Sequence, residues 1–315
     1  AAVTDEYHWY VLVCNGGCKV RLFELSPALA TKHQKAIASV STPSGNSITV
    51  CAINRNASWF AVATSDPETL CIWRTDQAVE FTSQSKSNRS SSSTAAASGS
   101  QQASEDPTAM IQNAHTAKIV SLAFADDHSR NMQGLPLAQV QTNQISNNQL
   151  AASCDGRFFA VATKMEDIFM WEILRTPSGE FKGIMRAGAI RGHGKAVNHL
   201  SFGGSTFPFN VVTSSNDRTI RLWQMSEFYR EGRLPDQIWC TNSPGEEDIP
   251  VVASSTHPVV AVIFPASIHI VHSLTGDMVA WVSVAGAVSV VWLNSILVVL
   301  TTTSVTFHDL KLPTK

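Results

Sequence analysis

Residues 191–224 constrain the fold more tightly than any other stretch of this 315-residue chain. Three short apolar runs follow one another here, separated by turn residues, and the third, at residues 220–223, ends in Trp223. Such runs predict the strands of an antiparallel sheet. His193 precedes the first run. Asp217 stands in the turn before the third run, 24 residues after His193 and six before Trp223.

This spacing predicts a hydrogen-bond network. In a radially arranged sheet, the loop before the first strand lies beside the turn that joins the second and third strands. We therefore expect His193 to donate to the Asp217 carboxylate, with Thr213 and the indole N–H of Trp223 extending the chain of bonds. A His–Asp pair is also half of a hydrolytic triad. The strand-and-turn spacing and the lack of a Ser or Cys nucleophile elbow favour a structural network.

An aromatic residue ends a similar apolar run at several places along the chain. The positions are Phe23, Trp73, Trp171, Trp223 and Phe307. Their intervals of 50, 98, 52 and 84 residues correspond to one or two periods of a four-stranded repeat of about 40–45 residues. The pattern resembles WD40 repeats, and the resemblance implies an all-β fold, a seven-bladed WD40 β-propeller.

Two blades of this propeller are expected to be irregular. Only about eight residues precede the strand expected at residues 9–13, which predicts an incomplete first blade. Between the strands expected at 119–124 and 137–141 lie 12 residues, whereas two full strands and their turns need about 20. The third blade is therefore expected to be degenerate or incomplete, unless residues are missing from the sequence.

The whole chain, residues 1–315, is expected to form a single propeller domain with one insertion. Residues 82–108 are rich in Ser and Ala and contain no Val, Leu, Ile, Met or aromatic residue. Such a segment buries too little apolar surface to offset its ordering entropy, so a mobile surface loop is expected. A phosphorylated regulatory segment is the alternative.

Composition excludes some functional classes. A hydrophobic content of 44% with only 15% charged residues suits a large, strand-rich core, and a formal net charge of −2 gives no basic footprint for nucleic acid. The six cysteines are scattered. Cys14 and Cys18 lack a second pair of zinc ligands, so reduced thiols in a cytosol-facing domain are expected.

Residues 278–307 carry no charge and could pass for a membrane span. They are rich in Val, Ile and Thr, and Ser and Asn interrupt them at the spacing of strands and turns. This composition favours two blades of buried strands over a membrane helix.

No catalytic motif is found, and neither a cofactor nor a metal is expected. The glycine-rich residues 203–206 fit a hairpin turn better than a phosphate loop. His257, His269 and His272 could suggest a metal site, but alternation along a strand separates neighbouring side chains. Four basic residues form a candidate partner-binding surface: Arg157, Lys195, Arg218 and Arg221.

A narrower resemblance lies at residues 142–173 and 180–202, which look like the transducin beta-like protein 2 family of WD40 proteins. That family implies a propeller on the cytoplasmic face of the endoplasmic reticulum, held by an N-terminal anchor. It also implies association with an endoplasmic-reticulum stress kinase or with translation machinery. The given sequence holds no such anchor, so membrane contact is expected only through a missing N-terminal segment.

Two classes of function remain at this point. The favoured one is a non-catalytic scaffold whose loops bind other proteins. The alternative is a propeller that uses its central channel as an enzyme or to bind a small molecule or nucleic acid. The channel-lining side chains distinguish them, because catalysis requires convergent acids or histidines there.

Overall fold

The computed structural model describes most of the chain. Its described residues are 2–4, 9–14, 17–25, 36–54, 57–65, 69–90, 106–112, 119, 121–124, 146–204, 209–225, 235–243, 248–293 and 295–312. The chain divides into two compact units, Ala1–Leu135 and Pro136–Lys315.

Antiparallel sheets of three or four strands, the blades, make up both units. In the first unit, blade 1 comprises β1 (Ala2–Thr4), β2 (Trp9–Cys14), β3 (Lys19–Leu25) and β4 (Ala38–Ser41), and blade 2 comprises β5 (Ile48–Ile53), β6 (Trp59–Thr64), β7 (Leu70–Arg74) and β8 (Ala109–Ile111). A short 3₁₀ turn, η2 (Pro43–Gly45), joins the two blades.

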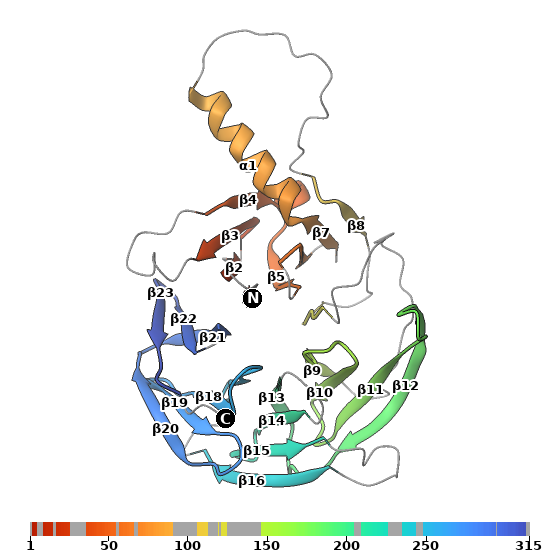
Figure 1. Ribbon diagram of the computed structural model, residues 1–315, viewed down its shortest axis with the longest axis vertical. Coiled ribbons are helices and arrows are strands. Elements are labelled where there is room, and N and C mark those ends of the chain that lie inside the picture. The colour runs from red at the N-terminus through yellow and green to blue at the C-terminus, as the bar shows by residue number, and fades with distance from the viewer. Residues whose placement is uncertain are drawn as a thin grey trace. The chain divides into compact units, whose positions relative to one another are not determined.

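The second unit holds four blades that follow one another in chain order (Figure 1). Blade 3 comprises β9 (Asn147–Ala152), β10 (Phe158–Thr163), β11 (Ile168–Arg175) and β12 (Phe181–Ile190), and blade 4 comprises β13 (Val197–Gly203), β14 (Asn210–Ser215), β15 (Thr219–Gln224) and β16 (Asp236–Asn242). Blade 5 comprises β17 (Val251–Ala253), β18 (Val259–Ile263), β19 (Ser267–His272) and β20 (Met278–Ser283), and blade 6 comprises β21 (Ala287–Leu293), β22 (Ile296–Thr301) and β23 (Val305–Asp309).

The first strands of these four blades lie next to one another. β13 contacts both β9 and β17, and β17 contacts β21. The later strands of each blade then follow outward, so that whole sheets face each other. This is the radial arrangement of a β-propeller, and it confirms the all-β propeller that the repeats predict.

A blade that lies between two other blades is apolar on both faces, because a neighbouring blade covers each face. In β10, Phe158 and Ala160 face a buried cluster shared with blade 4, whereas Phe159 and Val161 face a second cluster around Trp171. Alternate side chains of a strand point to opposite faces. A strand buried on both faces therefore reads as a continuous apolar run.

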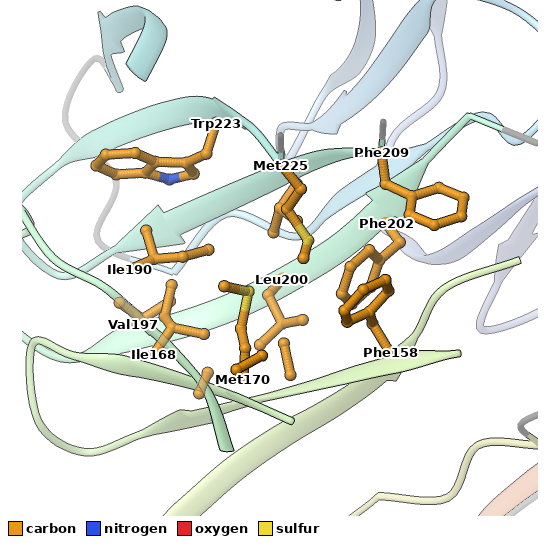
Figure 2. Packing of buried hydrophobic residues seen from close by; sticks show 14 residues of the cluster. Phe158, Ile168, Met170, Ile190, Val197, Leu200, Phe202, Phe209, Trp223 and Met225 are labelled. Atoms are coloured by element: carbon orange, nitrogen blue, oxygen red, sulfur yellow. The ribbon is translucent and has the colours of Figure 1, made fainter. Parts of the chain in front are cut away.

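The largest buried cluster lies between blades 3 and 4 (Figure 2). Phe158 of β10 meets Phe209, which precedes β14, with ring centroids 6.4 Å apart and an edge-on geometry. Met170 and Met225 fill the space beside Leu200, and all three side chains are fully buried. This packing holds the two blades face to face.

The described residues form six blades, so the prediction of seven was wrong. Residues 109–111 form β8 and complete blade 2, and Ile119 and residues 121–124, expected as a strand, are not one. Ile119 is instead buried, and its carbonyl accepts a hydrogen bond of 3.3 Å from the Thr49 hydroxyl of blade 2. Residues 137–141 lie outside the described residues, so a degenerate blade there stays a prediction.

The prediction of an incomplete first blade was also wrong. β1 pairs with β2 through Ala2 and Val11 at one end and Thr4 and Trp9 at the other. β1 is only three residues long, so it fits within the short N-terminal stretch. The fourth strand of the blade, β4, comes from residues that follow β3 in the chain. A single domain over residues 1–315 stays a prediction.

A helix, α1 (Thr75–Ser90), replaces the start of the expected surface loop, so the loop expected from residue 82 was wrong as far as residue 90. Tertiary contact explains the helix. Ala78 and Thr82 are both buried, one helical turn apart, and the backbone N–H of Ser39 in β4 donates to the Thr82 hydroxyl over 2.9 Å. Figure 1 shows α1 beside β4. Residues 91–105 of the insertion lie outside the described residues.

The uncharged stretch at residues 278–307 forms strands, as its composition predicts. β20 to β23 cover most of it, and Leu293 pairs with Ile296 across the turn that joins β21 and β22. Among the described residues, no helix has the length and apolar character needed to cross a membrane.

Replacing Phe209 by Ala tests the packing between blades 3 and 4. The side chain is fully buried, so its removal leaves a cavity, and we expect a loss of about 3–5 kcal/mol in the free energy of unfolding. The control is Val288→Ala on β21, whose side chain is 56% exposed and whose loss should cost less than about 0.5 kcal/mol. Denaturant unfolding measures the stability of both variants. Equal unfolding midpoints for Phe209→Ala and Val288→Ala would contradict this packing.

Candidate functional site

The loop before β13 and the turn between β14 and β15 meet through His193. Its Nδ1 lies 2.9 Å from Oδ2 of Asp217, and its Nε2 lies 2.8 Å from the Thr213 hydroxyl. The indole N–H of Trp223 donates to the same hydroxyl over 3.0 Å. The structure therefore brings together the four residues that the repeat spacing singles out.

The donors and acceptors of this hydrogen-bond network fit a neutral histidine. The Thr213 oxygen accepts from Trp223, and its own hydrogen can bond Nε2 of His193, which at 2.8 Å is closer than the Arg221 carbonyl at 3.4 Å. Nδ1–H of His193 then donates to Asp217. Burial lowers the pKa of His193, and the hydrogen bond with Asp217 only partly opposes this effect. A neutral ring with its proton on Nδ1 satisfies every one of these polar atoms.

Asp217 accepts more hydrogen bonds than the one from His193. The backbone N–H of Gly194 donates to its Oδ2 over 2.9 Å, and the Thr219 hydroxyl donates to its Oδ1 over 2.7 Å. Burial raises the pKa of Asp217, but the bonds from Thr219, Gly194 and His193 outweigh it and hold that pKa well below its usual range. The carboxylate is therefore a fixed charge that anchors loop and turn.

Glycine is required next to His193. Gly192 has a φ of 143°, and a Cβ there would lie 3.0 Å from both the Trp223 ring and the Arg221 guanidinium. The backbone must approach the indole closely for His193 to reach Thr213. This explains the Gly-His pair in physical terms.

A pocket of about 440 Å³ opens beside this network. Its lining residues, all of them polar except Ala196, come from three blades: Asn148, Lys164, Ala196, Asn198, His199, Asn216 and Asp248. These residues stand where β9, β13 and β17 begin or where β10 and β14 end, so they share one end of the blades. We call this the pocket end.

Hydrogen bonds hold two parts of the pocket wall. Asn198 donates from Nδ2 to Oδ1 of Asn216 over 2.5 Å, and Nε2 of His199 lies 2.7 Å from Oδ1 of Asp248. The Asp248 side chain is still 74% exposed. Sequence reasoning missed this site, because only its folded strands bring the polar residues together. The available signal was that Ala196, Asn198 and Asn216 lie close to His193 and Asp217 in sequence.

The structure does not bring all four basic residues of the predicted surface together. Lys195 and Arg218 are exposed at the pocket end, and Arg221 lies along the Trp223 ring with its Cζ 6.0 Å from the centroid. Arg157 lies in the turn between β9 and β10, at the opposite end of the blades.

The strand directions establish this separation. β9 and β13 start together, since Nδ2 of Asn148 donates to the Val197 carbonyl over 3.1 Å, so the turn after β9 lies at their far end. Arg157 also binds the buried Glu172, with Nη2 2.6 Å from Oε1. Arg157 therefore lies apart from the other three basic residues, where it neutralises a buried carboxylate, and its part in a partner surface stays a prediction.

The remaining candidates have structural roles. Gly203 packs against blade 5, where a Cβ would lie 2.9 Å from Ala253, so its small size serves sheet contact. His257 hydrogen-bonds Thr256, and His269 lies against the Phe264 ring with centroids 4.6 Å apart. Within the described part of the chain, no group of three or more His, Cys, Asp or Glu side chains could hold a metal ion.

Comparison with known proteins agrees with this geometry. Residues 186–224 match the WD40 family model, described as WD domain, G-beta repeat. That match covers blade 4 through β15, including the His193–Asp217 network. WD40 propellers are generally non-catalytic scaffolds that bind other proteins.

Two curated relatives make the resemblance more specific. The chain is 27% identical over 176 residues to human transducin beta-like protein 2, and 25% identical over 176 residues to the mouse protein of the same name. Each match covers 54% of this chain and 39% of the relative, so it spans about two fifths of the relatives' length. The chain is a β-propeller with one matched WD40 repeat, and it resembles the transducin beta-like protein 2 family.

His193→Ala and Asp217→Ala test the network. Each change removes a charge-assisted bond between the loop and the turn, so each should lower the free energy of unfolding by about 1–3 kcal/mol. The matched control is Asp277→Ala, which removes an exposed carboxylate from a turn of blade 5 and should cost less than about 0.5 kcal/mol. Thermal and denaturant unfolding give the values. Wild-type stability in both network variants would show that the bonds contribute nothing.

Proposed function

We propose that this chain is a non-catalytic scaffold that binds other proteins at its pocket end. The supporting observation is the polar pocket beside a rigid hydrogen-bond network. Asparagine amides both donate and accept, as the peptide groups of a bound polypeptide do. Lys164 and Asp248 are exposed around the same pocket and carry opposite charges. Such a site selects an extended peptide or loop with both polar backbone and charged side chains.

The network gives this site the rigidity that binding requires. Ala196 and Asn198 follow the loop that His193 holds, and Asn216 precedes Asp217. Preorganised loops lose less conformational entropy when a partner binds. Lys195 and Arg218, exposed in the same loop and turn, extend the proposed partner surface beyond the pocket.

Charge reversal in the pocket tests the proposal. We expect Lys164→Glu combined with Asp248→Arg to reduce partner recovery from cells about tenfold, which corresponds to roughly 1.4 kcal/mol of binding free energy. Quantitative affinity purification with mass spectrometry measures the recovery. The control is Lys182→Glu, which repeats the Lys164→Glu half of this change in blade 3, at the opposite end of the blades. Equal recovery by the wild type and a folded double variant would contradict binding at the pocket end.

We further propose that the full-length protein acts on the cytoplasmic face of the endoplasmic reticulum, in stress or translation control. The resemblance to the transducin beta-like protein 2 family supports this proposal, with an endoplasmic-reticulum stress kinase or translation machinery as the partner. Membrane attachment would then come from a segment outside residues 1–315.

Localisation tests this second proposal. Full-length protein tagged at its C-terminus should co-localise with an endoplasmic-reticulum marker, whereas residues 1–315 alone should not. Protease treatment of cells with a permeabilised plasma membrane should digest the propeller, because the proposal places it outside the lumen. A diffuse full-length protein, or one protected in the lumen, would contradict the location while leaving the pocket test unaffected.

A further inference from the structure

Two cysteines from neighbouring blades meet in the first unit. Cys14 ends β2 of blade 1, Cys51 lies within β5 of blade 2, and these two strands contact each other. The two thiols are hydrogen-bonded to each other. Both side chains pack against one buried cluster, which includes Leu12 and Val62. Each cysteine residue is partly exposed.

The shared hydrogen bond makes the two sulfurs unequal. It lowers the pKa of Cys51 to about 6 and raises the pKa of Cys14 far above its ordinary value, an effect that burial of Cys14 reinforces. The Cys14 S–H is therefore the donor, and the Cys51 thiolate is the acceptor. Because a thiolate is the reactive form of cysteine, Cys51 is the nucleophile of the pair.

We propose that Cys14 and Cys51 form a reversible disulfide when the protein meets a hydroperoxide. The Cys51 thiolate attacks one peroxide oxygen, the O–O bond breaks, and a sulfenic acid forms on Cys51 while hydroxide or alkoxide leaves and takes up a proton. The Cys14 sulfur then attacks Cys51, loses its proton and displaces water. Per disulfide, two thiols lose two electrons and two protons, and one hydroperoxide is reduced.

The position of the pair gives the bond a consequence for the fold. It would join blade 1 to blade 2 covalently, where side-chain packing and hydrogen bonding now hold them. In a reducing compartment, such a disulfide forms transiently and responds to oxidants. This site is separate from the pocket end of blades 3 to 5, so it stands whether or not the proposed function holds.

Peptide mapping of the oxidised chain tests the proposal. The reduced protein is treated with one equivalent of hydrogen peroxide, alkylated, and digested without reductant. We expect a linked peptide containing Cys14 and Cys51, the loss of two alkylatable thiols, and full reversal by dithiothreitol. If the wild-type chain is oxidised at other cysteines while Cys14 and Cys51 stay alkylatable, the proposal is overturned.

Single serine variants separate the roles of the two sulfurs. In Cys14→Ser, the sulfenic acid on Cys51 has no resolving thiol, so dimedone should trap it. Cys51→Ser should lose both the cross-link and the dimedone adduct. The matched control is Cys18→Ser, four residues from Cys14 and also half-buried, which should keep the cross-link. Loss of the cross-link in a folded Cys18→Ser chain would instead assign the partner of the bond to Cys18.

Discussion

The hydrogen bond between His193 and Asp217 determines the geometry on which the pocket depends. It joins the loop before β13 to the turn between β14 and β15 over 2.9 Å. Residues on both sides of this bond, Asn198 and Asn216 among them, form the pocket wall. The Gly194 backbone N–H also donates to this carboxylate, so two hydrogen bonds join the loop to the turn. The proposed binding at this end therefore depends on a polar network buried inside one blade.

Face-to-face burial explains why the blades occur in series. A blade with two apolar faces cannot remain alone in water, and each neighbour removes one such face from solvent. Phe158 and Phe209 do this between blades 3 and 4, and Val260 and Val262 of blade 5 cover blade 4 from its other side. The same packing places the first strands of successive blades together, and the pocket lies where those strands begin.

Sequence spacing could predict the contacts of His193 because they lie within one repeat. The count of blades could not be predicted in this way, since β8 completes blade 2 after an insertion and carries no aromatic signature. Helix α1 depends on the burial of Thr82 against blade 1, a contact far apart in sequence. Sequence spacing also does not tell at which end of the blades Arg157 lies, because this depends on the direction of the strands. The pocket could not be predicted either, because it includes Asp248 from a third blade.

The protonation of His193 tests the central claim most directly. The two hydrogen bonds of the ring fit a neutral histidine, with its proton on Nδ1 facing Asp217 and with Nε2 accepting from Thr213. Two-dimensional ¹H–¹⁵N NMR of the histidine rings, assigned with His193→Gln, follows this site as the pH falls. We predict the Nδ1–H tautomer at pH 7 and a titration midpoint below the ordinary value of about 6.5. A midpoint at or above that value, or a proton on Nε2 at pH 7, would contradict the account.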